Sequence, residues 1–359
     1  MIPIAKPDIG EEEIEAVCEV LRSGMIAEGK IVAEFEEKFA GYIGTDHAVA
    51  VNSGTAALHT ALLAHGIGSG DEVITTSFSF IATANSIMYT GAKPVFADIE
   101  PNTFNIDPSL IEEKITDNTK AIMPVHLYGH PAEMKAITEI TEDHDLILIE
   151  DACQAHGAAY HGKKVGSFGT GAFSFYPTKN MTTSEGGMMT TNDEEVARKA
   201  KMIRAHGSQQ RYLHEMVGYN LRMTDIGAAI GLTQLKKLPS YNSLRQRNAA
   251  LLSKGLEDTD GITVPVVREG CEHMFHQYTI RVNDRDEILT KLGQAGIGTG
   301  VYYPIPIHMQ PIYKDAGYKD ELPECEKASK EVLSLPVHPG VSEEEIQQII
   351  DAVIKGVEL

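Results

Sequence analysis

The pattern of hydrophobic and polar positions divides this chain of 359 residues into three regions. In the central region, short apolar runs of strand length alternate with helical stretches, such as those at residues 55–65 and 81–90. Strands interleaved with helices are typical of a mostly parallel sheet that carries helices on both faces. We therefore predict an α/β fold. The predicted strands are residues 48–52, 72–76, 94–98, 121–126, 146–150, 172–175 and 188–191.

The first region is helical. Its first helix begins with an acidic turn and ends at Gly24, and its apolar positions recur at helical spacing. Those positions are Ile14, Val17, Cys18 and Leu21. A second short helix is predicted at residues 32–42.

The third region follows Thr224. A long helix begins at Asp225 and is expected to end before Pro239, because proline disrupts a helix interior, and a second helix follows. An α+β pattern comes next, with a strand at residues 277–282 and a helix at 284–295. We predict a large domain of residues 1–240, which includes the N-terminal helix, and a smaller α+β domain of residues 241–359.

The charge balance limits the possible partners. There are 31 basic and 51 acidic residues, which gives a net charge of −20. Such a field repels phosphate backbones, so we expect neither nucleic-acid nor membrane binding. The N-terminus lacks the apolar stretch of a signal peptide, and the four cysteines form no CxxC pair. We expect a cytoplasmic protein with free thiols and no metal site.

Four polar motifs lie at or near the ends of predicted strands, where ligands bind in open α/β sheets. The small residues around Gly54 and Thr55 could cradle a phosphate at a helix start or could simply cap that helix. The apolar run before Asp151 ends in a carboxylate, which could face a cofactor or form a solvated strand end. Lys179 follows Ser174 in a loop with few charges. Asn220 and Arg222 precede a helix whose capping does not explain them.

Pyridoxal 5'-phosphate (PLP) requires this combination of groups. It needs a phosphate cradle, a carboxylate at its ring nitrogen, a stacking ring and a lysine that forms a Schiff base. Gly54, Asp151 and Lys179 supply the cradle, carboxylate and lysine in chain order, and Phe80 can supply the stacking ring. PLP is therefore the predicted cofactor.

The sequence also resembles the fold-type I, PLP-dependent sugar aminotransferases of the DegT/DnrJ/EryC1/StrS family. The resemblance rests on segments that cover nearly the whole length in the family's order. They include SGTAALHTAL, GAKPVFADIEP, IEDACQAHGA, FSFYPTKNMTTSEGGMMTTND, VGYNLRMTDIGAAIGLTQL and YYPIPIH. The segment RYLHEMVGYNLRMTD is most similar to perosamine synthases.

The resemblance implies roles for individual residues. Lys179 matches the catalytic lysine, and Asp151 matches the carboxylate at the ring nitrogen. Gln154 matches the residue that binds the phenolic oxygen of the cofactor, and Phe80 the stacking ring. The implied phosphate ligands are Gly54, Thr55 and Ser174, with the Ala56 amide nearby. Asn220 matches an asparagine that reaches the phosphate from a neighbouring subunit, so the resemblance implies a homodimer with shared active sites.

The implied reaction moves an amino group from glutamate to a nucleotide-linked 4-keto-6-deoxy sugar, as in GDP-perosamine synthases. Candidate contacts are Arg222, Arg211 and Lys30 for the pyrophosphate and His308 for the sugar. A 3-keto-sugar aminotransferase, a PLP-dependent sugar dehydratase and a non-catalytic regulatory protein are the alternatives. Lys179 argues against the dehydratase, because the sugar dehydratases of this family have a histidine in place of this lysine.

Overall fold

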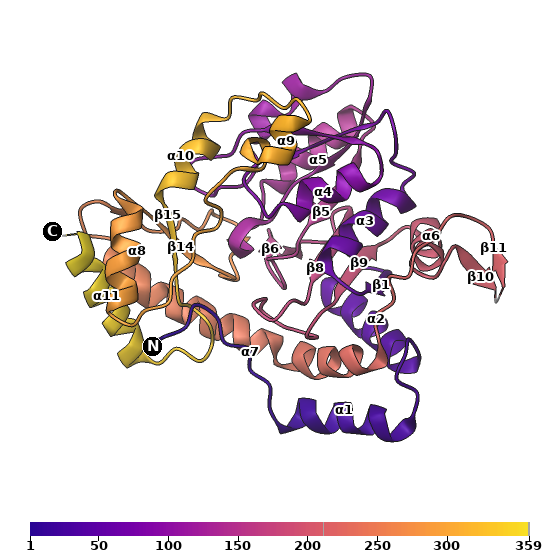
Figure 1. Ribbon diagram of the computed structural model, residues 1–359, viewed down its shortest axis with the longest axis horizontal. Coiled ribbons are helices and arrows are strands. Elements are labelled where there is room, and N and C mark those ends of the chain that lie inside the picture. Colours follow the sequence, from indigo (N-terminus) through magenta and orange to yellow (C-terminus); the bar gives the residue numbers. More distant parts are fainter. Residues whose placement is uncertain (211, 358–359) are drawn as a thin grey trace.

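A seven-stranded sheet forms the centre of the protein in the computed structural model, which describes residues 1–210 and 212–357 (Figure 1). All neighbouring strands are parallel except β9, which is antiparallel to β1 and β8. The strands, in spatial order, are β1 (His47–Val51), β9 (Gly187–Thr191), β8 (Thr170–Ser174), β5 (Ile147–Asp151), β4 (Thr119–Met123), β2 (Glu72–Thr76) and β3 (Lys93–Ala97). The predicted strands and the mostly parallel α/β fold are confirmed.

Helices cover both faces of this sheet, as alternation along the strands requires. Val49 and Val51 of β1 pack in one core with α3 (Gly54–Ala64) and α6 (Glu194–Arg204). Ala48 and Ala50 pack in another core with α2 (Lys30–Ile43) and the first half of α7 (Asp225–Leu256). Helices α4 (Ala82–Tyr89) and α5 (Met134–Asp143) complete the two layers.

Helix α7 is continuous through Pro239, so the predicted break there is wrong. Tyr241 and Asn242, just beyond the proline, are buried, and Leu238 before it is buried too. Packing on both sides of Pro239 therefore holds the helix together across the one backbone hydrogen bond that proline cannot donate. The helix joins two cores, because Leu252 and Leu256 near its end belong to the C-terminal core.

The C-terminal region has its own small antiparallel sheet, in the order β12 (Ile262–Thr263), β14 (Tyr278–Val282) and β15 (Val332–Leu335). Helices α8 (Arg285–Gln294) and α11 (Glu343–Val357) pack against each other at this end of the molecule. Ile2 lies in the same core, so the first residues of the chain pack with the last third. The division at residue 240 remains a prediction.

The remaining elements are short or peripheral. They are α1 (Glu11–Ser23), α9 (Pro311–Asp315), α10 (Pro323–Glu331), β6 (Ala159–Tyr160), β7 (Lys163–Lys164), β10 (Ser208–Gln210), β11 (Leu213–His214) and β13 (Cys271–Glu272), with 3₁₀ turns at Pro108–Leu110, Glu112–Lys114, Leu127–Gly129 and Ile307–Met309. Gly24 ends α1 in the left-handed region, at φ 73°. No helix in the described part of the chain is long and apolar enough to cross a membrane.

Several histidines of the core are held neutral by burial. His156 lies between the rings of Phe173 and Phe175, and neither of its ring nitrogens has a hydrogen-bond partner in the described chain. Burial, with the nearby Lys179 charge, lowers the pKa of His156 to about 3, and burial lowers that of His130 to about 4. The unfolded chain therefore binds more protons than the folded chain below the ordinary histidine pKa of about 6.5.

We predict that stability falls as the pH drops below about 6.5, by on the order of 2 kcal/mol per buried histidine at pH 5. Urea unfolding at pH 7 and pH 5 measures this loss. His156→Phe removes one protonatable group and is expected to reduce the loss, whereas His144→Phe, at an exposed position, is expected to leave it unchanged. An equal pH dependence in His156→Phe and the wild type would contradict the assignment.

Candidate active site

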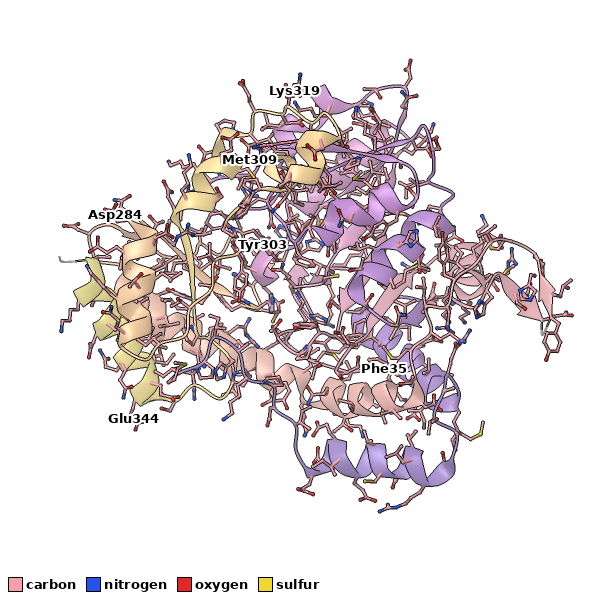
Figure 2. The ribbon with its side chains drawn as sticks, viewed as in Figure 1. Phe35, Asp284, Tyr303, Met309, Lys319 and Glu344 are labelled. Carbon is pink, nitrogen blue, oxygen red and sulfur yellow. The ribbon has the colours of Figure 1, made fainter. Side chains whose placement is uncertain are left out.

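A cavity of about 500 Å³ opens where the carboxyl ends of the parallel strands meet the C-terminal region. Asp151 ends β5, Ser174 ends β8, and Gly54 follows β1 at the start of α3. Tyr303, labelled near the centre of Figure 2, lines the cavity from the C-terminal region. The predicted site residues that line it are Gly54, Thr55, Phe80, Asp151, Gln154, Ser174 and Lys179.

The start of α3 forms a concave surface of backbone and small side chains. Ser53 caps the helix by accepting the Ala56 amide at 3.1 Å, while the amides of Gly54 and Thr55 have no acceptor in the described chain. A Cβ on Gly54 would lie 2.5 Å from the Ser174 Cβ and 3.1 Å from the Cys153 sulfur. Glycine is therefore required at this close approach, and two amide donors point out of a helix N-terminus, as an anion site needs.

The Asp151 carboxylate is nearly buried at the end of β5. Its Oδ2 accepts the Thr83 hydroxyl at 2.8 Å, and its Oδ1 accepts the Cys153 amide at 3.2 Å. Thr83 also bonds Ser79 at 2.7 Å, so a chain of hydroxyl groups from α4 and the loop before it fixes this carboxylate. No basic side chain in the described chain forms an ion pair with Asp151, which suits it to a cationic group on a ligand.

Gln154 is held in position from both ends of its amide. Its Oε1 accepts the Tyr128 amide at 2.9 Å, and its Nε2 donates to the Tyr303 hydroxyl at 3.1 Å. The second Nε2 proton has no acceptor in the described chain and is available to a ligand oxygen. Burial and the nearby Asp151 charge raise the pKa of Tyr303, so its hydroxyl stays protonated.

Lys179 reaches the same cavity from the loop after β8. Its ammonium group makes no hydrogen bond or ion pair with the residues that the structure describes. Burial lowers the pKa of Lys179, and the thiol of Cys153 and the carboxylate of Asp151 oppose this effect. A desolvated lysine is more often neutral, and only the neutral amine is nucleophilic or able to accept a proton.

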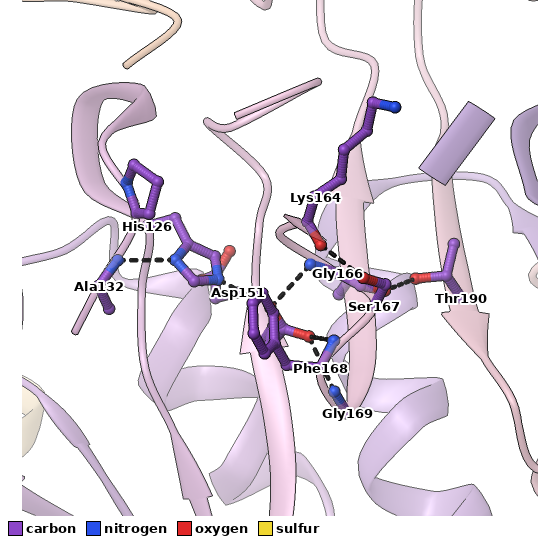
Figure 3. A network of polar contacts seen from close by, with 12 residues as sticks. His126, Ala132, Asp151, Lys164, Gly166, Ser167, Phe168, Gly169 and Thr190 are labelled. Carbon is purple, nitrogen blue, oxygen red and sulfur yellow. Dashed lines mark hydrogen bonds and ion pairs between the residues drawn. The ribbon is translucent and has the colours of Figure 1, made fainter. Parts of the chain in front are cut away.

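Glu150, one residue before Asp151, anchors the strand end from the opposite side. Its carboxylate accepts the amides of Gly166, Phe168 and Gly169 at 2.7, 2.8 and 2.9 Å (Figure 3). His126 Nε2 donates to Glu150 at 3.1 Å, while His126 Nδ1 accepts the Ala132 amide at 3.0 Å, which fixes the orientation of the ring. Glu150 thus ties β5 to β4 and to the loop that enters β8.

The other predicted contacts lie away from the cavity lining. His308 is buried against Ser77, which its Nδ1 contacts at 2.7 Å, and its Nε2 lies 3.5 Å from Glu326. The guanidinium group of Arg222 lies 3.9 Å from the Glu28 carboxylate. Asn220 is exposed, and its backbone forms an isolated antiparallel β-bridge with Ala205, just after α6. Lys30 is exposed at the start of α2, and Arg211 lies outside the described residues. In this single chain His308 does not reach the cavity, so its predicted sugar contact has no geometric support.

Several side chains of the cavity were not predicted from the sequence. Thr83 holds Asp151, and Tyr302 and Tyr303 approach from the C-terminal region. His276 and Gln277, just before β14, line the same cavity. Tyr302 and Tyr303 stand in a segment already recognised as family-like, so they could have been proposed, whereas no local pattern distinguishes His276 or Gln277.

The residues present fit PLP. An anion cradle at α3, an unpaired carboxylate, a desolvated lysine and the half-exposed ring of Phe80 line one cavity. The cradle would hold the phosphate, Asp151 the ring nitrogen and Lys179 the aldehyde. These assignments remain predictions.

Gly54→Ala is expected to weaken PLP binding by tenfold or more, because its Cβ would push Ser174 into the phosphate cradle. Titration of the apoenzyme with PLP, followed by visible absorbance, measures the affinity. Gly41→Ala is the matched control, since a Cβ at that helical glycine meets nothing within 4 Å. Wild-type affinity in Gly54→Ala would show that the phosphate binds elsewhere.

Known proteins are similar to this chain over nearly its whole length. The sequence matches the DegT/DnrJ/EryC1/StrS aminotransferase family over residues 7–354. A pleiotropic regulatory protein of Geobacillus stearothermophilus is 47% identical over 353 residues, which cover 97% of this chain and 94% of that protein. A GDP-perosamine synthase of Caulobacter vibrioides is 42% identical over 362 residues, which cover 98% of this chain and 97% of the synthase.

A solved structure of S. venezuelae DesV has the same fold, with a TM-score of 0.94 at 42% identity, over 97% of this chain and 95% of that chain. The family match covers nearly the whole sequence, and the structure contains a cavity whose side chains suit PLP. The chain belongs to the DegT/DnrJ/EryC1/StrS family and is a PLP-dependent sugar aminotransferase.

Proposed function

We propose that this enzyme transfers an amino group from glutamate to carbon 4 of a GDP-linked 4-keto-6-deoxy sugar, in the cytoplasm. The observation that carries the proposal is that Lys179 lines one cavity with Asp151 and has no ion-pair partner among the described residues. The similarity to a GDP-perosamine synthase supports the choice of sugar nucleotide. The four cysteines are all unpaired, which fits a reducing compartment.

Bound PLP supplies an aldehyde that carries the amino group and a ring that accepts electrons. Lys179 moves protons at the reacting carbon, first in the donor reaction and then, in the reverse sense, in the sugar reaction. The lowered pKa of Lys179 increases the fraction of neutral amine at neutral pH, which is the form able to take a proton.

Asp151 has a complementary role. Its carboxylate would keep the ring nitrogen protonated, because opposite charges stabilise each other strongly in a partly desolvated site. The bonds from Thr83 and the Cys153 amide leave the carboxylate oxygens fixed in one orientation. Asp151 therefore provides a charge that needs little reorganisation during the reaction.

Other relatives support a second candidate, amination at carbon 3. Their names specify a 3-amino sugar, a 3-dehydro sugar or a 3-oxo sugar, at 41%, 41% and 39% identity. A regulatory role without catalysis is the alternative that the names of two further relatives raise. A protein without catalytic function has no need for a desolvated lysine, so we favour the enzyme.

Incubation with glutamate and a panel of GDP-, dTDP- and UDP-linked 4-keto and 3-keto 6-deoxy sugars tests the proposal. We expect formation of 2-oxoglutarate with the GDP-linked 4-keto sugar and a product that carries nitrogen at carbon 4 by NMR. Lys179→Ala is expected to lose activity by many orders of magnitude. Turnover of 3-keto sugars alone would favour the second candidate, and no turnover with any sugar nucleotide would contradict the substrate class.

We further propose a homodimer with shared active sites. Two features support it: Asn220 lies outside the cavity of its own chain, and α1 with its following loop exposes apolar side chains. Ile14, Leu21 and Met25 are 48%, 53% and 70% exposed, so the apolar face of α1 is incompletely covered by the chain itself. Apolar surface of this kind often marks a contact between subunits.

Subunit complementation tests the sharing of sites. Lys179→Ala and Asn220→Ala are each expected to be nearly inactive as homodimers. In a mixed dimer, one site combines the intact lysine of one subunit with the intact asparagine of the other, so co-expression is expected to restore up to about a quarter of wild-type activity. Absence of restoration in isolated mixed dimers would place Asn220 in the site of its own chain or outside any site.

A further inference from the structure

Two adjacent side chains of the cavity have no polar partner in the part of the chain that the structure describes. His276 and Gln277 are 5% and 6% exposed, and both line the cavity. Neither side chain forms a hydrogen bond with the residues that the structure describes, and His276 Nδ1 is fully enclosed. An unsatisfied buried polar group costs about 1–3 kcal/mol. His276 Nδ1 is such a group, and the amide of Gln277 beside it has no hydrogen-bond partner in the described chain, so the two residues form a wall that is able to bind a polar ligand.

This wall is rigid, because its backbone is fixed by neighbours. The Gln277 amide donates to the Tyr128 carbonyl at 3.2 Å, and Arg245 donates to the carbonyls of Phe275 and His276 at 3.2 and 3.3 Å. Strand β14 begins at the next residue. The two side chains are therefore held in place before a ligand arrives, which lowers the entropy cost of binding.

The wall carries no charge. Burial lowers the pKa of His276 well below its usual value, and the positive groups Lys179 and Arg245 add to the effect, with His156 and His273 also facing it. The imidazole is therefore neutral. Nδ1 is enclosed and has no partner in the described chain, whereas Nε2 is not enclosed, so the tautomer with its proton on Nε2 leaves an N–H donor available to the cavity.

The lack of charge selects the ligand. The anion cradle is formed by the start of α3, a different element of the cavity lining, so this wall is not needed for a phosphate. A carboxylate would be better matched by a cation than by an imidazole and an amide. Sugar hydroxyl and keto oxygens are neutral donors and acceptors, and they match one N–H together with the amide of Gln277.

We propose that His276 and Gln277 bind the hexose ring of the nucleotide sugar and act in the sugar half-reaction only. This inference rests on the proposed function, because it requires a sugar substrate. His276 donates from Nε2 to a sugar oxygen, and Gln277 both donates and accepts. A sugar that lacks the matching oxygens would leave the polar groups of His276 and Gln277 without partners. It would therefore bind more weakly, and the site would discriminate between sugars.

The test uses PLP-loaded enzyme and measures the two half-reactions separately. Mixing with glutamate alone, followed by absorbance, gives the donor rate, and the amino form mixed with the keto-sugar nucleotide gives the sugar rate. His276→Leu and Gln277→Leu are expected to lower kcat/KM for the sugar nucleotide by about 10- to 100-fold. The donor rate is expected to stay within about threefold, since no donor contact is removed.

Two further variants separate binding from folding. His276→Gln keeps an amide donor at the position of Nε2 and is expected to recover part of the lost sugar rate. His144→Leu removes an exposed histidine far from the cavity and is expected to match the wild type. Equal losses in both half-reactions, or unchanged sugar kinetics in both leucine variants, would overturn the inference.

Failure of the proposed function is recognised separately. In that case the wild type reacts with glutamate but with no keto sugar. Calorimetry then compares GDP with GDP linked to a 4-keto-6-deoxyhexose. If the hexose improves wild-type affinity and His276→Leu removes the gain, the hexose-binding role of His276 is supported even though the enzyme does not turn the sugar over. If the hexose gives the wild type no gain, the inference falls as well.

Discussion

The geometry of the cavity depends on the buried carboxylate of Glu150. A carboxylate enclosed by protein is costly unless its oxygens accept hydrogen bonds, and here four N–H donors satisfy them. Three of those donors belong to the loop that enters β8, and the fourth is His126 after β4. Because side chains alternate along a strand, fixing Glu150 on one side directs Asp151 to the other, toward the cavity. One interaction therefore sets the spacing of the strand ends and the orientation of the carboxylate that is predicted to bind the cofactor.

The two sides of the cavity differ in the charge of the groups that line them. The side built from the large sheet uses helix amides, a fixed carboxylate and a desolvated lysine, all of which suit a charged cofactor. The lining contributed by the C-terminal region is uncharged, and its histidine stays neutral because burial and nearby cations oppose protonation. Arg245 lies behind this lining, where it donates to two backbone carbonyls and has no carboxylate partner in the described chain. Burial lowers its pKa to about 10.

Much of the fold could be predicted from the sequence, because strand-length apolar runs and glycine-terminated helices are local signals. Asp151 and Ser174 could be placed at strand ends for the same reason. The break at Pro239 was wrong because its local rule was overridden by packing on both sides of the helix. His276 and Gln277 gave no signal, since their surroundings arise only when β14 packs beside Gly129 and the strand ends. His308 had a family-like context, but the bond to Ser77 uses it within the protein interior.

The net charge of −20 is compatible with a cavity that binds anions. Arg245 is a buried cation with no carboxylate partner among the described residues, so its charge is little compensated nearby. A desolvated positive charge is stabilised when an anion enters, and a phosphate at the start of α3 would supply one. The acidic surface meanwhile repels extended polyanions, which cannot reach the cavity. On the proposed function, charge would select the cofactor and the nucleotide, and the uncharged wall of His276 and Gln277 would select among sugars by the geometry of its hydrogen bonds.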